Sequence, residues 1–324
     1  TEEDIKRAIK DKNEERKLLN EFYELAKSEP SALTSLELYQ VSYQAQFKFD
    51  RDELKEAVKY AHIRGVQVFV TTNTLRKENE IEDFLEYAKF LYDIDVDAII
   101  LQDIGMARLI KRELPDFELH ASTQMVAHSL EDVKYLESVG FDRVVLAREV
   151  TVEEIKYICD NCKADIEVFV HGALCVCYSG QCLMSSMIGN RSGNRGRCAQ
   201  PCRMEYTLKG EKTGEQRGYL LSPKDMCTIE NVNEIIESGT YSLKIEGRMK
   251  RPEYVAGVVD NYRKAVDKVL FKKKYNEQEG KGQLLQLFNR SGFTNAYLKG
   301  NTGRDMMSFK SPKNAGVPLG IVEK

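Results

Sequence analysis

Residues 130–172 read L-E-D-V-K-Y-L-E-S-V-G-F-D-R-V-V-L-A-R-E-V-T-V-E-E-I-K-Y-I-C-D-N-C-K-A-D-I-E-V-F-V-H-G. Within this stretch, two segments with helical spacing of apolar residues each precede a short apolar run, at 143–149 and at 166–172. Both runs are β-branched and continuous in apolar character, which is typical of parallel strands buried on both faces. The stretch therefore predicts two successive helix–strand units of an α/β protein.

The same unit repeats on both sides of this stretch. Further strands, alternating with helical segments, are predicted at 67–73, 97–103, 118–124 and 241–248, and a less regular one at 218–225. We expect a TIM-barrel-like (β/α) repeat with atypical first two units, because residues 1–46 do not supply clean ones. An open doubly wound sheet is the alternative architecture.

Changes in composition divide the chain into segments. Residues 1–46 are expected to form a helical N-terminal segment, and residues 47–271 a barrel-like catalytic domain with a Cys-rich loop at 173–203. A polar linker is predicted at 272–282. The remainder, 283–324, is rich in Gly, Asn and Ser and is interpreted as the start of a small C-terminal β domain.

Charge and hydropathy exclude several classes of protein. The net charge of −3 and the pI near 6.0 argue against a protein that coats nucleic acid through bulk charge. No run of 18 apolar residues predicts a membrane span, and the charged start is not a signal peptide. We therefore expect a cytoplasmic protein, in which clustered cysteines more often bind metal than form disulfides.

Five of the eight cysteines lie within the 28 residues from Cys175 to Cys202. Thiolates on an irregular, Gly-rich loop are typical of a metal or iron–sulfur centre. Zinc in the same pocket and buried free thiols are the alternatives, since spacing alone does not distinguish them. Cys177 alternates with Cys175 and is expected to point away. Cys159 and Cys162 form a C-x-x-C at a helix end with no matching pair, so we expect no metal role for them.

Four arginines accompany these cysteines: Arg191, Arg195, Arg197 and Arg203. A local basic patch is sufficient to contact RNA phosphates, whatever the net charge. The alternative is that they serve only as solvated surface residues.

Polar residues end the predicted strands and would ring the carboxyl mouth of a barrel, where active sites lie. They include Asn73, Gln102, Asp103, His120, Gln124, Arg148, Glu149 and His171. His120 and His171 can transfer protons near neutral pH and are candidate catalytic residues, although a structural role is equally open. For Glu167 a salt bridge at the edge of the core is the favoured interpretation.

Lys244, Glu246 and Arg248 alternate along one strand and share a face. Buried ionisable groups need partners, so this face is expected either to bind an anionic ligand such as a small dicarboxylate or to form a mutual ion-pair network. All three are candidate catalytic residues.

Peptidase chemistry finds little support in the motifs. The sequence has no G-x-S-x-G and no H-E-x-x-H. A catalytic cysteine paired with His171 is conceivable, but it leaves the other loop cysteines unexplained.

Several longer motifs resemble the U32 peptidase family, the collagenase-like proteases. They are E-V-F-V-H-G-A-L-C-V-C-Y-S-G-Q-C-L-M-S (167–185), H-A-S-T-Q-M (120–125), V-V-L-A-R-E (144–149), N-R-G-R-C-A-Q-P-C-R (194–203), S-P-K-D-M-C (222–227) and L-K-I-E-G-R-M-K (243–250). The resemblance runs from about residue 47 to residue 320. The strands E-L-L-A-P-A-G and D-A-V-Y-L-G-G that open the family are absent, and residues 1–46 resemble nothing in that fold.

The resemblance implies a [4Fe-4S] cluster and hydroxylation of a tRNA uridine, a 23S rRNA cytidine or a ubiquinone precursor, with prephenate as an oxygen source for RNA. Carried onto this sequence, one family pattern gives the cluster ligands Cys175, Cys182, Cys198 and Cys227, which we favour. A second pattern replaces Cys227 with Cys202. The tail (288–320) is more similar to the rRNA branch. We therefore predict an RNA pyrimidine hydroxylase with RNA and a small dicarboxylate as partners, and no membrane. A U32-type peptidase or a hydroxylase of a non-RNA substrate is the alternative.

Overall fold

The computed structural model describes residues 51–211, 214–247, 250–300 and 302–316. The predicted N-terminal segment 1–46 and Arg248 lie outside the described residues. No helix in the described part of the chain is long and apolar enough to cross a membrane.

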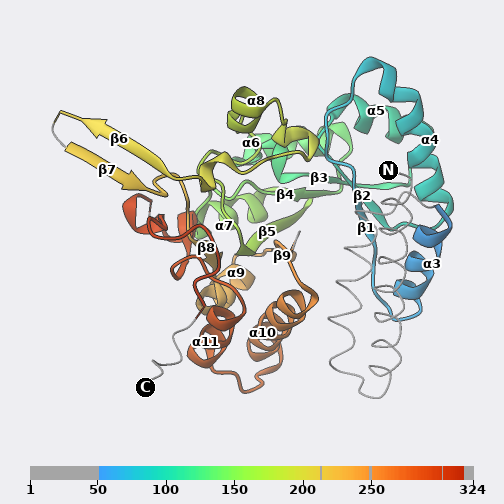
Figure 1. The fold of residues 1–324 in the computed structure, drawn as a ribbon. Coiled ribbons are helices and arrows are strands. Elements are labelled where there is room, and N and C mark those ends of the chain that lie inside the picture. The colour runs from blue at the N-terminus through green and yellow to red at the C-terminus, as the bar shows by residue number, and fades with distance from the viewer. Residues whose placement is uncertain (1–50, 212–213, 248–249, 301, 317–324) are drawn as a thin grey trace, which may run out of the picture.

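A mostly parallel sheet forms the centre of the molecule (Figure 1). Its parallel strands are β1 (Phe69–Thr71), β2 (Ala98–Leu101), β3 (Glu118–Ala121), β4 (Arg143–Val145), β5 (Asp165–Gly172) and β9 (Ser242–Ile245), each paired with the next in this order. All six strands lie within predicted ranges or overlap them closely. The sequential order confirms the predicted α/β class.

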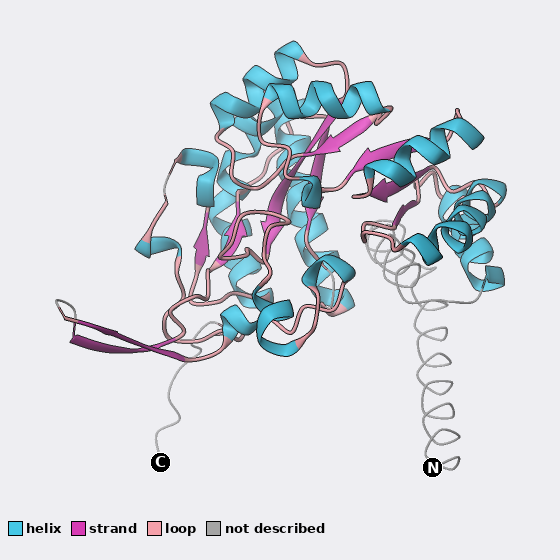
Figure 2. Cartoon of the chain, turned by 90° about the horizontal axis from the view of Figure 1, so that it is seen from above, coloured by secondary structure: helices cyan, strands magenta, loops and turns pink. Residues whose placement is uncertain are grey.

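Helices connect these strands and cover one face of the sheet (Figures 1 and 2). They are α3 (Arg51–His62), α4 (Ile81–Asp93), α5 (Ile104–Glu113), α6 (Leu130–Val139), α7 (Val152–Asn161), α9 (Val232–Glu237) and α10 (Pro252–Phe271). Capping residues fix where α6 and α7 begin. The side chains of Ser129 and Thr151 each accept a hydrogen bond from the backbone of the third residue of the helix that follows.

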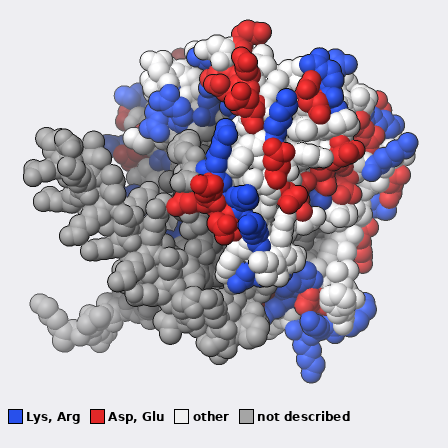
Figure 3. Space-filling view, turned by 90° about the vertical axis from the view of Figure 1, so that its right-hand side faces the viewer, with Lys and Arg blue, Asp and Glu red and all other residues white. Residues whose placement is uncertain are grey.

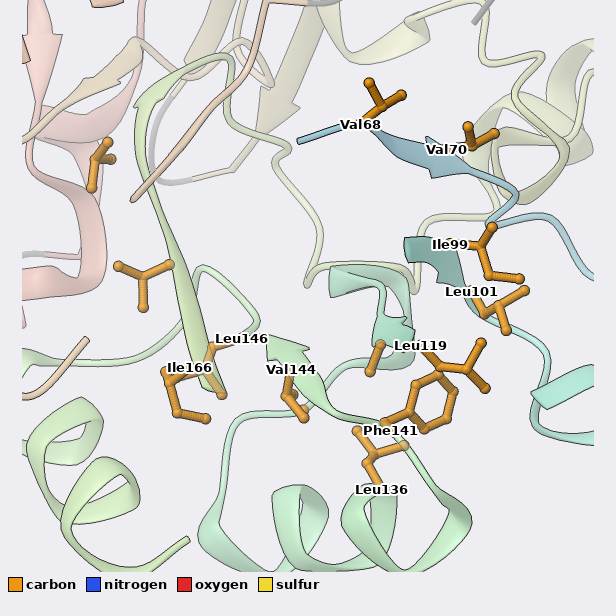
Figure 4. Close-up of a cluster of buried hydrophobic side chains, with 14 of the residues drawn as sticks. Val68, Val70, Ile99, Leu101, Leu119, Leu136, Phe141, Val144, Leu146 and Ile166 are labelled. Carbon is orange, nitrogen blue, oxygen red and sulfur yellow. The ribbon is translucent and has the colours of Figure 1, made fainter. Parts of the chain in front are cut away.

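The two faces of the strands differ in chemistry. Leu119, Val144 and Ile166 belong to the main hydrophobic core, together with Leu136 of α6 and Phe141 of the connection that follows it (Figure 4). Burial of each such side chain contributes about 1.5–3 kcal/mol. Alternate residues of the same strands carry charge on the opposite face, although the sequence predicted apolar burial on both. Lysines and arginines are interspersed with acids over the outer face shown in Figure 3, as the low net charge predicts.

The chain departs from the repeat after β5. A hairpin of β6 (Tyr206–Gly210) and β7 (Gly214–Gly218) projects from the body (Figures 1 and 2). The strand predicted at 218–225 is wrong, because β8 begins only at Asp225 and ends at Cys227. Strand β8 pairs antiparallel with β5.

The predicted linker and C-terminal domain also differ from the structure. Helix α11 (Glu277–Leu287) occupies half of the predicted linker. Its start is fixed by Asn276, which accepts hydrogen bonds from the backbone of Gln278 and Glu279, and Leu284 is fully buried. Strand β10 (Phe293–Thr294) pairs with β8 and extends the main sheet. The described part of the tail is therefore continuous with the central fold.

Closure of a barrel is not observed in the described residues. There, β1 pairs only with β2 and forms one edge of the sheet.

Candidate functional site

The Cys-rich loop lies across the carboxyl ends of several strands. It leaves β5 at Gly172, whose φ of 119° is a conformation that favours glycine. A Cβ added to Gly172 would lie 2.6 Å from Glu246 Cβ, so there is no room for a side chain at this position. At Gly180, an added Cβ would lie 2.4 Å from the carbonyl oxygen of Gln124, just after β3. Glycine at these positions lets the loop seat directly on the strand ends.

Polar contacts fasten the same loop to two further strand ends. The Ser179 backbone donates to Glu149 Oε1 at 3.1 Å, just after β4. Arg195 donates to both carboxylate oxygens of Glu80 and to the carbonyl oxygen of Leu75 at 2.7 Å, in the segment after β1. The loop is thus held over the mouth that the sequence predicted.

Four cysteines of the loop come together. Electrostatic interactions link Cys175 with Cys182 and Cys198, and they link Cys202 with all three. Gly193 lies between the parts of the loop that carry Cys182 and Cys198. A Cβ added to Gly193 would lie 3.7 Å from Cys198 Cβ and 3.8 Å from the carbonyl oxygen of Cys182. Helix α8 (Met184–Gly189) connects them, and its Ser185 hydroxyl accepts from the backbone of Ala199 at 2.9 Å.

The cysteines gather without forming a finished metal site. Within the described ranges, no group of three or more His, Cys, Asp or Glu side chains is arranged to hold a metal ion. All eight cysteines are free thiols. The loop cysteines therefore form a neighbourhood of thiols rather than a set of ligands at bonding distance.

Two arginines give this neighbourhood a positive potential. Burial raises the pKa of the Cys175 thiol, whereas Arg148 and Arg203 lower it. The Arg148 guanidinium lies 3.9 Å from the centre of the Phe169 ring. Arg203 donates to the carbonyl oxygens of Leu174 at 2.6 Å and of Pro223 at 2.6 Å. Both cations are thus fixed beside the thiols, where they favour thiolate.

The predicted ligand Cys227 lies elsewhere. It is 6% exposed on β8 within the main core, and its Sγ is 3.9 Å from the hydroxyl of Tyr262. Burial raises the pKa of its thiol to about 11. Of the two candidates for the fourth position, Cys202 interacts electrostatically with the other three cysteines, whereas Cys227 lies in the core. In S-P-K-D-M-C the backbone enters a buried strand, and this turns Cys227 toward α10.

The remaining cysteines fulfil different roles. Cys177 interacts with Cys182 through a hydrogen bond between the side chains, so it does not simply point away. Cys159 and Cys162 lie at the end of α7, and burial raises the pKa of Cys159 to about 12. That value describes an inert thiol at neutral pH.

His120 lies in a buried ion network within the sheet. Its Nε2 is 2.6 Å from Glu118 Oε1 and its ring packs edge-on against Phe69, with centroids 4.6 Å apart. Burial lowers the pKa of His120, although Glu118 opposes that change. Arg143 extends the network toward Glu118 at 3.8 Å and Glu167 at 3.6 Å. These contacts are those expected of the structural role, the alternative to catalysis that the sequence left open.

Lys244 and Glu246 have charged partners. Lys244 Nζ lies 2.5 Å from Glu167 Oε1. Lys244 and Glu167 therefore form an ion pair with each other, which is one of the two arrangements expected from the sequence. Glu246 Oε2 is 3.9 Å from Arg148 at the mouth. The predicted anion-binding face is therefore divided: Lys244 belongs to the internal network, and Glu246 lies beside Arg148.

His171 is enclosed on the side of α10. It is 1% exposed, its Nδ1 is 3.4 Å from the Tyr262 hydroxyl, and aromatic rings surround it. Burial and the neighbouring Lys250 lower its pKa to about 3, so the imidazole is neutral. It does not lie with the loop cysteines that a Cys–His nucleophile would require.

Sequence reasoning did not single out a polar cluster behind this histidine. Arg290 Nη1 lies 2.5 Å from Asp225 Oδ1 in a pair that is almost fully buried. Three buried atoms of this cluster have no hydrogen-bond partner among the described residues: His171 Nε2, Asp225 Oδ2 and the Tyr254 hydroxyl. Burial lowers the pKa of the nearby Lys250 to about 8. The motif S-P-K-D contained Asp225, but its partner lies 65 residues further on.

Comparison with known proteins confirms the resemblance. The family model described as peptidase family U32 matches residues 35–308. The chain belongs to peptidase family U32.

Named relatives differ in activity. The chain is 38% identical over 281 residues to the 23S rRNA 5-hydroxycytidine C2501 synthase of Escherichia coli (strain K12), covering 84% of this chain and 42% of that protein. It is 39% identical over 230 residues to tRNA hydroxylation protein P1 of Bacillus subtilis (strain 168), covering 68% and 54%. It is 32% identical over 269 residues to the collagenase of Porphyromonas gingivalis (strain ATCC BAA-308 / W83), covering 78% and 62%. The chain thus spans about half the length of these relatives.

Among solved structures, that of the U32 peptidase Mk0906 aligns with 41% of this chain and 59% of that chain, at 16% identity and a TM-score of 0.35.

Proposed function

We propose that this chain is part of an RNA hydroxylase that adds a hydroxyl group to a pyrimidine base and holds a [4Fe-4S] cluster on Cys175, Cys182, Cys198 and Cys202. The observation that carries the proposal is the meeting of these four thiols over the carboxyl ends of the strands. A [4Fe-4S] cluster needs four thiolates that approach from different directions, and the loop supplies two from the segment before α8 and two from the segment after it.

The surroundings of the thiols fit such a cluster. The backbone of Gln200 donates to Cys198 Sγ at 3.3 Å, and hydrogen bonds to sulfur tune iron–sulfur centres. Arg148 and Arg203 offset negative charge at Cys175, and Arg203 does so at Cys202. When bound, the cluster would supply electron transfer or activation of an oxygen-bearing substrate. Arg195 and Glu80 hold the loop in position, and Phe169 fixes Arg148 beside it.

RNA is the proposed substrate because the rRNA and tRNA relatives named above act on RNA. We place a 23S rRNA cytidine ahead of a tRNA wobble uridine, in line with the tail motifs and the rRNA relative. A base within structured RNA must be exposed or flipped to reach the cysteines. A small dicarboxylate such as prephenate is proposed as the oxygen source. Of the predicted anion-binding residues, Lys244 is paired with Glu167, and we propose that the co-substrate binds at the mouth near Arg148.

A peptidase is the second candidate, favoured by the collagenase relative. The described residues give it weak chemical support. His171 is buried and neutral, and the thiol nearest to it along the sheet, Cys227, has a pKa raised to about 11. Neither group is a ready nucleophile or base at neutral pH.

The experiment is a nucleoside inventory. RNA from a strain that lacks the full-length protein is digested and analysed by mass spectrometry, alongside RNA from the same strain complemented with the wild type or with Cys198→Ala. We expect one hydroxylated pyrimidine to disappear, to return with the wild type and to stay absent with Cys198→Ala. An unchanged inventory removes the RNA assignment and leaves the peptidase to be tested on gelatin.

A further inference from the structure

An exposed apolar face lies on the same loop as the cysteines. Helix α8 presents Met187 at 81% exposure and Ile188 at 67%, and Leu183 precedes it at 59%. Leu183 and Met187 are four residues apart and share one side of the helix. The short helix η4 (Pro201–Arg203) packs against α8 and is followed directly by Met204, which is 61% exposed. Apolar faces of this kind usually mark interaction sites.

Exposed arginines border this face at the end of α8. Arg191 and Arg197 are both exposed, and the Arg191 Nε donates to the carbonyl oxygen of Arg197 at 3.0 Å. Within the described residues neither guanidinium forms an ion pair, whereas Arg195 pairs with Glu80 and Arg203 is fixed by carbonyl groups. No acidic residue occurs between positions 173 and 204. A chain with net charge −3 therefore presents a locally positive apolar surface.

The combination of exposed apolar side chains and arginines on this surface favours an anionic partner with exposed aromatic rings. Apolar side chains that stand free beside arginines can insert between bases while the arginines bind the flanking phosphates. The core of an interface between two copies of one chain is instead depleted of charge. Along the chain, Leu183 directly follows Cys182 and Arg197 directly precedes Cys198. A strand of RNA seated here is delivered to the cysteines.

We propose that Leu183, Met187, Ile188, Met204, Arg191 and Arg197 form the docking surface for an unpaired loop of RNA, in which the apolar side chains take the place of a base that has left its stack. This inference rests on the proposed function and adds to it the site and the structural class of the RNA, a single-stranded loop rather than a duplex. A duplex keeps its bases stacked and offers the apolar side chains nothing to contact.

The test measures binding of the full chain to a fluorescein-labelled RNA hairpin with a pyrimidine-rich loop, and to the same stem closed as a blunt duplex. For Arg191→Gln/Arg197→Gln we expect hairpin binding about tenfold weaker and a salt slope of log Kd lower by about 1.4, as two phosphate contacts on a single strand are lost. For Met187→Ser/Ile188→Ser we expect hairpin binding about tenfold weaker with the salt slope unchanged. We expect the wild type to bind the duplex only weakly, and Met187→Ser/Ile188→Ser to bind the duplex with the same affinity as the wild type.

The matched control is Lys156→Gln/Lys264→Gln, which removes two exposed positive charges from α7 and α10. It is expected to bind the hairpin like the wild type. Iron content and far-UV circular dichroism check that each variant is folded. Where a double variant loses iron, the single variants Arg197→Gln and Met187→Ser replace it.

Three outcomes overturn the inference. If both loop variants bind the hairpin like the wild type, the surface is wrong and the proposed function stands. If the wild type, loaded with its cluster, binds no RNA, both are wrong. If sedimentation shows a wild-type dimer that Met187→Ser/Ile188→Ser dissociates, a second copy of the chain covers this face.

Discussion

Glu80 and Arg195 form a two-point ion pair between segments 115 residues apart, with Nη1–Oε2 and Nη2–Oε1 separations of 3.0 and 2.6 Å. Paired hydrogen bonds of this geometry are directional as well as charged. The pair ties the cysteine loop to the segment after β1, and Arg195 also donates to the carbonyl oxygen of Leu75. The hydrogen bond from Arg195 lowers the pKa of Glu80 to about 2, so the pair is charged throughout the neutral range.

Loss of this ion pair should loosen the loop around the proposed cluster. For Glu80→Gln we expect iron to be lost to a chelator about tenfold faster, which is the usual effect of removing a group that orients metal ligands. The measurement is the bleaching of visible absorbance under anaerobic chelator challenge. Lys156→Gln, which removes an ion pair on α7, is the control and should bleach like the wild type. Equal rates for Glu80→Gln and the wild type would show that the loop needs no such tether.

The choice between Cys202 and Cys227 gives a second prediction. Cys202→Ala should abolish the iron–sulfur absorbance near 400 nm, because Cys202 lies with the other three thiols. Cys227→Ala should retain it and instead lower the free energy of unfolding by about 1 kcal/mol, as expected when a small buried side chain is truncated. Cys159→Ala should retain the colour as well. The opposite result for the first two variants would restore the family pattern that uses the later cysteine.

How far the sequence predicts this structure depends on the range of the interactions. The strands at β4 and β5 are readable because their apolar runs are local, and the capping residues Ser129 and Thr151 mark the helix starts. The charged face was not readable, since Arg143 and Glu167 acquire partners only when neighbouring strands align. The sequence favoured Cys227 because motif order contains no information on which way a side chain turns. The same limit concealed the helix at 277–287, whose polar sequence is ordered by one cap and one buried leucine.

The buried pair of Asp225 and Arg290 gives a prediction about stability. Arg290 approaches Asp225 at 2.5 Å, and Asp225 is 1% exposed. Arg290→Met would leave a carboxylate buried without its cation, and we expect the free energy of unfolding to fall by about 3–5 kcal/mol. The double variant Asp225→Leu/Arg290→Met should lose less than the single one. Urea denaturation followed by circular dichroism measures both, and a double variant less stable than Arg290→Met contradicts this account.

His171 makes the stability of the fold depend on pH. Burial lowers its pKa from 6.5 to about 3 in the folded state, so the unfolded chain binds the proton first as pH falls. The stabilisation is therefore complete above pH 6.5 and is lost progressively toward pH 3. At pH 5 the unfolded state gains about 2 kcal/mol from this one group. His171→Phe, which keeps an aromatic ring among Tyr254, Tyr262 and Phe293, should flatten the curve of unfolding free energy against pH by that amount. A His171→Phe curve as steep as that of the wild type would show that this imidazole is protonated in the folded protein, and the buried neutral histidine would have to be abandoned.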